Sequence, residues 1–220
     1  MQDRYGTTVS LALILTTTAL SLVILHLAPD GAMVPVHFSR DWEADKFVRP
    51  HTGVVIWTGL QLGIWALMYT LPLLSRSGEG FRESRTVYDA AWVTLTALLC
   101  TVQIAAMEEA IGIKIAKISL VNVMMGFFLV VVGNGLGKIR PNELIGIRTP
   151  WTKASVRVWN RTHRTSAPIF ILVGALLIAS GFGILGIPSG SGFRIGCILI
   201  SAALSCGLSW LYWRSEQKKS

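Results

Sequence analysis

Six long stretches without a charged side chain constrain the fold of this 220-residue chain more than any other feature. The shortest stretch, Ala90 to Met107, holds 18 residues. As a helix with about 1.5 Å of rise per residue it would cover roughly 27 Å, close to the approximately 30 Å hydrocarbon core of a bilayer. The stretches lie between Arg4 and Asp30, Arg49 and Arg76, Asp89 and Glu108, Lys117 and Lys138, Arg164 and Arg194, and Arg194 and Arg214.

The composition agrees with placement of these stretches in a membrane. Hydrophobic residues make up 52% of the chain and charged residues only 15%. A soluble bundle needs polar helix faces for water, and six consecutive helices that are apolar on every face do not supply them. We therefore expect an all-α, polytopic membrane protein with six transmembrane helices.

The first stretch has the features of a retained helix rather than of a cleaved signal peptide. Asp3 and Arg4 cancel, so the region before it carries no net positive charge. The apolar run from Thr7 to Ala28 is also longer than the core of about 7–15 residues that is typical of signal peptides. We expect it to remain as the first transmembrane helix.

The distribution of lysine and arginine predicts the orientation. Fourteen of the 20 fall in the N-terminus, the second and fourth loops and the C-terminus, and six fall in the other loops. The positive-inside rule then places both termini in the cytoplasm of a bacterial cell, with the chain in its plasma membrane. The net charge of +8 is explained by anionic lipid headgroups at the inner face, without direct nucleic-acid binding.

We divide the chain at residue 74. Residues 1–74 form an N-terminal membrane segment, two helices joined by an outer loop at 29–52. Residues 75–220 form a second membrane segment of four helices with a basic cytoplasmic loop at 138–165.

Small and polar residues within the stretches predict helix packing. Small residues four apart allow close backbone approach in lipid, and amides form hydrogen bonds between helices. The small residues are Gly126, Gly133 and Gly137, then Ala175, Ala179 and Gly183, then Ser201, Ser205 and Ser209. The amides are Gln61, Gln103, Asn122 and Asn134.

The basic loop at 138–165 carries the most specific pattern. Pro141, Gly146 and Pro150 exclude a continuous helix through its first part, and Thr152 or Ser155 is suited to cap a short helix that runs to Arg164. That helix would be interfacial, with basic side chains on one face and indoles at the water boundary. The basic residues are Arg157, Arg161 and Arg164, and the indoles are Trp151 and Trp159.

This loop resembles the signature of the SdpI immunity-protein family. The resemblance covers about 45 residues and rests on the Gly-Ile-Arg-Thr-Pro-Trp-Thr string together with the helix before it. The residues that carry it are Asn122, Gly126, Gly133, Asn134, Lys138, Pro141, Asn142, Gly146, Ile147, Arg148, Thr149, Pro150, Trp151, Thr152, Trp159 and His163.

The outer loop resembles the short domain that often precedes the SdpI segment. Its pattern is a Pro-x-His-Phe stretch followed by an acidic residue, and it departs from the usual form in lacking a glycine before that residue. The matching residues are Pro35, His37, Phe38 and Asp45.

The resemblance implies an immunity or receptor protein with no cofactor. Members protect bacteria from a secreted, membrane-active toxin peptide, and the founding member also signals by holding a transcriptional repressor at the membrane. We expect the outer loop, with Phe38, Trp42 and Phe47, to meet the toxin. The basic inner loop would then meet a cytoplasmic protein.

Other functions stay open as alternatives. A membrane-embedded enzyme would use acid–base pairs such as His37 with Asp45 or His163 with Glu143, although the chain has no known catalytic motif. A small-molecule transporter would usually carry ionisable residues near the midplane of the membrane. His37, His51, Asp41 and Asp45 are suitable metal ligands, but their spacing matches no known site, so we expect none. Arg148 is equally suited to bind a carboxylate or phosphate or to bond neighbouring carbonyls.

Overall fold

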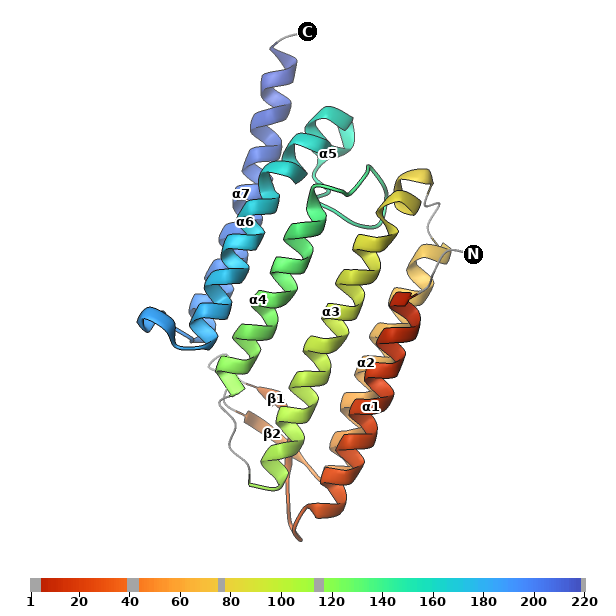
Figure 1. The fold of residues 1–220 in the computed structure, drawn as a ribbon, viewed down its shortest axis with the longest axis vertical. Coiled ribbons are helices and arrows are strands. Elements are labelled where there is room, and N and C mark those ends of the chain that lie inside the picture. Colours follow the sequence, from red (N-terminus) through yellow and green to blue (C-terminus); the bar gives the residue numbers. More distant parts are fainter. Residues whose placement is uncertain (1–4, 39–43, 75–77, 113–116, 219–220) are drawn as a thin grey trace.

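The computed structural model describes residues 5–38, 44–74, 78–112 and 117–218. Six long helices in these residues run side by side (Figure 1). They are α1 (Tyr5–Leu27), α2 (Pro50–Leu74), α3 (Glu79–Ala110), α4 (Lys117–Leu136), α6 (Val156–Gly181) and α7 (Ser191–Gln217). All except α4 are long and apolar enough to cross a membrane. The predicted all-α, polytopic membrane fold is therefore confirmed.

Helix α4 decides whether the chain crosses the membrane six times. It has 20 residues, which span about 30 Å at 1.5 Å per residue. Its residues Leu120–Leu136 are apolar. Six crossings stay a prediction, and the full length of α4 is compatible with it.

Short elements mark the two ends of the helices. They are β1 (Val34–Phe38), β2 (Ala44–Val48), α5 (Pro150–Ala154) and the 3₁₀ helix η1 (Ile184–Gly186). The strands lie at one end, which we call the hairpin end (Figure 1). The segment 137–149 and α5 lie at the other, the loop end, and both termini lie towards it.

The structure also contains an antiparallel hairpin of β1 and β2, which the sequence analysis did not predict. Val34 is fully buried, and a Cβ added at Gly53 of α2 would come within 2.8 Å of it, so strand and helix are in close contact. The indole N–H of Trp57 in α2 donates to the carbonyl of Pro35 at 3.1 Å. The hairpin is therefore fixed to the helices rather than free in solvent.

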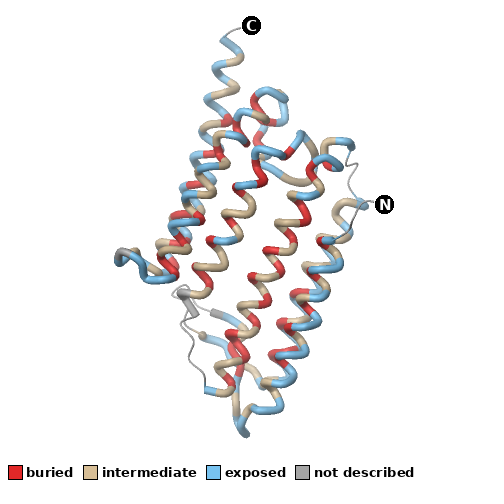
Figure 2. The backbone as a smooth tube through the Cα atoms, viewed as in Figure 1, coloured by how far each residue is buried: buried red, intermediate tan, exposed pale blue. Residues whose placement is uncertain are grey.

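Helix α3 is the central element of the molecule. Half of the residues in its apolar window are buried, against 22% in α1 and 17% in α2 (Figure 2). Its hairpin end packs on Val34 and Trp57, and its other end carries Phe81, Tyr88 and Trp92 in an aromatic cluster. One continuous helix thus joins the hairpin to the loop end.

Close packing of the C-terminal helices is confirmed. A Cβ on Gly126 of α4 would lie 2.4 Å from the carbonyl oxygen of Gly174 in α6, so only glycine permits this approach. Ser201, Ser205 and Ser209 are buried along α7. The predicted stripe on α6 is wrong, however, because Ala175 is exposed and Gly183 has nothing within 4 Å of its Cβ position.

The short helix of the basic loop differs from its predicted extent. The structure has a short helix only at Pro150–Ala154, and residues 156–164 are the first turns of the long helix α6. Ser155 separates the two helices in an extended conformation, and its hydroxyl caps α6 by accepting from the N–H of Val158 at 3.3 Å. The capping prediction for Ser155 is therefore confirmed.

Candidate functional site

Residues 146–152 fold into a compact turn that begins α5. The N–H of Thr152 donates to Oγ1 of Thr149 at 3.2 Å, and the N–H of Thr149 donates to Oγ1 of Thr152 at 2.9 Å, which is a reciprocal cap. The Thr152 hydroxyl also donates to the carbonyl of Ile147 at 2.8 Å. The Thr149 hydroxyl donates to Ser209 of α7 at 3.0 Å, so the turn is tied to the last helix.

Trp159 and His163 of α6 support this turn from inside the protein. Both side chains are buried, and their rings stack with centroids 4.3 Å apart. Nδ1 of His163 lies 2.8 Å from the Trp159 carbonyl, and Nε2 accepts from the N–H of Ile147 at 2.9 Å. The Trp159 indole donates to the carbonyl of Ile139 at 2.9 Å. The two side chains therefore fix loop backbone at two points.

These contacts correct two predictions. Trp159 is buried at 1% exposure, so it is not an anchor at the water boundary. Both ring nitrogens of His163 are engaged with backbone groups, while Glu143 is exposed on the loop. This arrangement leaves His163 no free nitrogen for acid–base chemistry with Glu143.

Asn142 forms the first turn of the same loop. Its Oδ1 accepts from the N–H groups of Leu144 and Ile145 at 2.8 and 2.9 Å, and its Nδ2 donates to the carbonyl of Arg140 at 2.7 Å. The N–H of Arg140 in turn donates to the hydroxyl of Ser84 in α3 at 2.9 Å. The asparagine thus shapes a turn that connects the C-terminal helices to α3.

The part of the signature that is accessible to a partner is small. Gly146, Arg148 and Pro150 are exposed, and Trp151 is half-buried. Since Ile147, Thr149 and Thr152 bond to each other or to α6 and α7, these four residues form the outward surface of the turn. Recognition of an anion by Arg148 stays a prediction.

A basic cleft lies between α6 and α7, lined in part by Arg157, Arg161, Tyr212 and Glu216. An open hollow of about 650 Å³ adjoins it on α6 and is lined in part by Arg157, Arg161 and Arg164. The Arg161 guanidinium lies 4.2 Å from the ring centre of Tyr212, and Arg157 lies 3.8 Å from Glu216. Three exposed guanidinium groups on one helix face are suited to bind phosphates or carboxylates.

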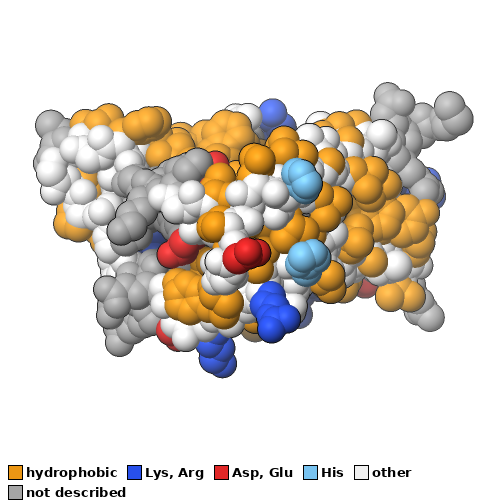
Figure 3. Space-filling model, turned by 90° about the horizontal axis from the view of Figure 1, so that it is seen from below, with side chains coloured by type: hydrophobic (Ala, Val, Ile, Leu, Met, Phe, Trp, Pro, Cys, Tyr) orange, Lys and Arg blue, Asp and Glu red, His pale blue; other side chains and the backbone are white. Residues whose placement is uncertain are grey.

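The hairpin end presents a second candidate surface. Nδ1 of His37 lies 2.6 Å from a carboxylate oxygen of Asp45, and both side chains are about half-exposed. A hollow of about 430 Å³, lined in part by Asp30, Arg49 and His51, lies between the end of α1 and the start of α2. Charged and histidine side chains stand singly among hydrophobic ones on this end (Figure 3).

Some of the predicted outer-loop residues cannot be placed in this surface. Asp41 and Trp42 lie outside the described residues, as does the side chain of Phe38. Pro35 is buried and Phe47 is 43% exposed. Among the residues that the structure describes, there is no group of three or more His, Cys, Asp or Glu side chains that would hold a metal ion.

Comparison with known proteins shows what this chain is similar to. Residues 138–212 match the model of the SdpI/YfhL protein family. The immunity protein SdpI of Bacillus subtilis (strain 168) is 21% identical over 174 residues, which are 79% of this chain and 80% of that protein. The chain therefore carries an SdpI segment at residues 138–212, and its similarity to SdpI extends beyond that segment. No solved structure matches it.

The SdpI segment contains the whole of the loop, α5, α6 and most of α7. It therefore includes the capped turn, His163 and the arginines of the basic cleft, whereas Asn122 and Asn134 lie before it in α4. The five helices that can cross a membrane, together with the similarity to SdpI, indicate a multi-pass protein of the bacterial plasma membrane.

Asn122 and Asn134 have different environments. Asn122 is fully buried, and its Nδ2 donates to the Ser180 hydroxyl and the Ser189 carbonyl, each at 3.1 Å. Its Oδ1 accepts from the guanidinium of Arg194. The predicted interhelical bonding is confirmed for Asn122, while Asn134 is exposed.

Two buried glutamines link the first three helices. Nε2 of Gln61 in α2 donates to Oε1 of Gln103 in α3 at 2.7 Å. Nε2 of Gln103 donates to the hydroxyl of Ser21 in α1 at 2.9 Å. This network confirms that the amides bond between helices.

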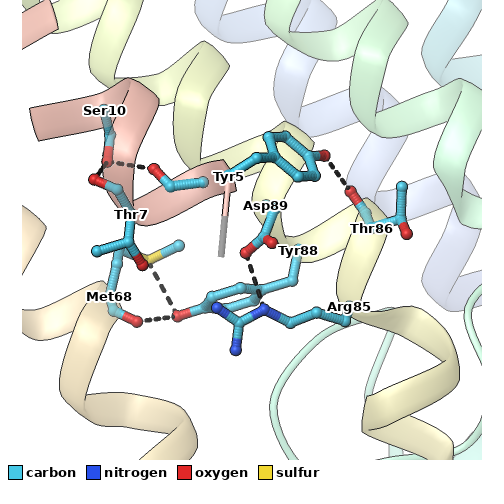
Figure 4. A network of polar contacts seen from close by, with 9 residues as sticks. Tyr5, Thr7, Ser10, Met68, Arg85, Thr86, Tyr88 and Asp89 are labelled. Atoms are coloured by element: carbon cyan, nitrogen blue, oxygen red, sulfur yellow. Dashed lines mark hydrogen bonds and ion pairs between the residues drawn. The ribbon is translucent and has the colours of Figure 1, made fainter. Parts of the chain in front are cut away.

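Two buried charged residues were missed from the sequence. Arg194 was assigned to a loop, but it lies in the first turn of α7 and is 3% exposed. Asp89 of α3 is fully buried and pairs with Arg85 at 2.9 Å (Figure 4). It packs against Gly6 at the start of α1, where a Cβ would lie 2.7 Å from its Oδ1. The sequence did indicate both residues, because each borders an uncharged stretch. A charged side chain at such a position can point into the helix bundle.

Proposed function

We propose that this chain protects a bacterial cell against a secreted, membrane-active toxin peptide. The observation that carries the proposal is the similarity to an immunity protein over most of both chains. The SdpI segment at 138–212 supports it independently.

The hairpin end is the surface that we assign to the toxin. It combines an exposed aromatic ring, Phe47, with the His37–Asp45 pair and the hollow beside Arg49. An amphipathic peptide offers apolar and charged groups together, which this mixed surface complements. The hairpin is fixed on α2 and α3, so the surface is preorganised for binding.

Survival of a Bacillus subtilis strain that lacks its own immunity protein tests this function. Production of this chain should restore growth beside toxin-producing cells. A variant with alanine at His37, Asp45 and Phe47 should lower survival about tenfold or more, because loss of an aromatic anchor and a charged pair costs on the order of 1.4 kcal/mol or more of binding.

The matched control is Phe182→Ala, since Phe182 is an exposed phenylalanine at the end of α6 outside the hairpin. It should protect as well as the unaltered chain. Membrane levels of all variants are compared by immunoblot. Full protection by the triple variant would contradict the role of the hairpin, and no protection by the unaltered chain would contradict the function.

We assign the hairpin end to the outside of the cell and the loop end to the cytoplasm. In a chain without native cysteines, Lys46→Cys in β2 and Lys153→Cys in α5 place single thiols at two exposed positions, one at each end. A membrane-impermeant maleimide should label Lys46→Cys on intact cells and Lys153→Cys only after lysis. Labelling of Lys153→Cys on intact cells would reverse the orientation.

The basic cleft favours a second role, in which the chain holds a cytoplasmic transcriptional repressor at the membrane. Three arginines on α6 offer a cationic surface for acidic side chains of such a protein. Glutamine at Arg157 and Arg161 should abolish toxin-dependent changes in the transcripts measured by RNA sequencing while survival is kept. Unchanged transcripts in cells with the unaltered chain would contradict this role.

A further inference from the structure

An apolar cavity of about 260 Å³ lies beneath the signature loop. Val87 and Ala91 of α3, Val132 of α4 and Phe170 of α6 line it, and Ile147 lies at the loop side. These side chains form none of the hydrogen bonds of the capped turn, and several of them belong to the apolar cluster around Trp159. The cavity is therefore an apolar space between the loop and the helices.

The gap is local and does not reflect loose packing of the two helices. Close to the cavity, a Cβ added at Gly135 of α4 would lie 2.4 Å from Val87. Helices α3 and α4 thus touch directly at the wall of the cavity. A space of this kind is maintained when something fills it, because empty apolar volume costs packing energy.

The ends of the uncharged stretches indicate how deep in the membrane the cavity lies. On α3 the uncharged stretch begins at Ala90, directly after Asp89, and Ala91 lines the cavity. On α4 the uncharged stretch ends before Lys138, and Leu136 lines the cavity. Both helices therefore place it at the boundary between hydrocarbon and headgroups, where acyl chains join the polar part of a lipid.

Two exposed cations are next in the chain to wall residues of the cavity. Lys138 and Arg148 are exposed, and each is the chain neighbour of a wall residue, Ile139 and Ile147 respectively. Arg140, on the other side of Ile139, is paired with Glu83 at 3.1 Å. An occupant with an apolar tail and an anionic head would satisfy the walls and these cations together.

We propose that this cavity binds one acyl chain of an anionic phospholipid, whose phosphate contacts Lys138 and Arg148. The volume lies just below the approximately 300–1,000 Å³ of pockets that enclose whole drug-sized ligands, so part of one chain fits and the rest of the lipid stays in the bilayer. The site is separate from the hairpin surface and does not depend on the immunity function.

Native mass spectrometry of the purified chain tests the site. After transfer from nanodiscs that hold equal amounts of phosphatidylglycerol and phosphatidylcholine, the unaltered chain should retain one phosphatidylglycerol. Ala91→Leu fills the cavity and should lower retention roughly tenfold. The matched control is Ala66→Leu, at an exposed position of α2, which should retain the lipid fully.

The charged part of the site is tested with glutamine at Lys138 and Arg148, which should remove the preference for phosphatidylglycerol. Equal retention of both lipids by the unaltered chain would overturn the assigned headgroup contacts. Equal retention of the lipid by Ala91→Leu and Ala66→Leu would contradict binding of the acyl chain in the cavity.

A measurement on the unaltered chain covers the case in which Ala91→Leu does not fold. Phosphatidylglycerol with a photoreactive group in one acyl chain should label peptides that contain Val87, Ala91 or Val132. Labelling confined to the exposed faces of α1 and α2 would overturn the proposal.

Discussion

The Gly146→Ala variant is expected to lose about 2 to 4 kcal/mol of stability through the addition of one methyl group. Gly146 has a φ of +116°, a conformation that residues with a Cβ adopt only at a cost. A Cβ there would also lie 2.6 Å from Nε2 of His163 and 3.0 Å from the ring of Trp159. Because both rings are buried, the loop must move instead and break the bond from Ile147 to His163.

Thermal unfolding in detergent, followed by circular dichroism, measures this loss. The midpoint should fall by roughly 5 to 10 °C. Gly63→Ala is the control, since Gly63 lies inside α2 with nothing within 4 Å of its Cβ position. Its midpoint should stay or rise slightly, because alanine favours the helix. Equal midpoints for the two variants would show that the loop tolerates the methyl group.

Combination with His163→Ala tests the cause. This change removes the ring that the new methyl group would meet, together with the bond that the clash breaks. The double variant should therefore be less destabilised than the sum of the two single variants. Strict additivity would mean that Gly146 and His163 act independently.

The uncharged stretches predicted the six long helices because charge placement reports directly on the solvent around a segment. A charge in hydrocarbon is costly, so the uncharged stretch between Arg4 and Asp30 in the sequence contains the whole of α1. The same reasoning misplaced Arg194. It treated this charge as the boundary of a helix, whereas Arg194 lies inside the helix end and is bonded to Asn122 of another helix.

The burial of Trp159 could not be predicted from the sequence because it depends on tertiary contacts. Spacing alone groups Trp159 with Trp151 as indoles near the membrane surface. The structure separates them, because the loop folds back over α6 and covers Trp159 while Trp151 stays half-buried. The hairpin was missed for a related reason. Its strands have five residues each, and Val34 is identified as a core residue only by Gly53 and Trp57, which follow much later in the chain.

The Asn122→Leu variant is expected to have the second large effect, a loss of about 2 to 3 kcal/mol. The leucine keeps a similar volume but removes the amide oxygen that accepts from the buried guanidinium of Arg194. It also removes the donor to Ser180 and to the carbonyl of Ser189, which joins α4 to the connection between α6 and α7. Hydrogen bonds to charged groups are among the stronger ones, and the cost is greatest where water cannot replace the lost partner.

Asn134→Leu is the matched control, because it makes the same change in the same helix at an exposed side chain. In detergent its unfolding midpoint should stay within a degree or two of the unaltered protein, whereas Asn122→Leu should lower the midpoint by about 5 °C or more. Equal effects at both positions would mean that the Arg194 contact contributes little.

The double variant with leucine at Asn122 and Arg194 separates loss of a bond from burial of a charge. If Asn122 matters mainly because it satisfies a buried cation, removal of the cation should recover part of the stability that Asn122→Leu loses. If the bonds to Ser180 and Ser189 dominate, the double variant should be no more stable than Asn122→Leu. Recovery is the expected result, because Arg194 is only 3% exposed. Loss of the amide that bonds to its buried charge costs more than loss of the bonds to neutral groups.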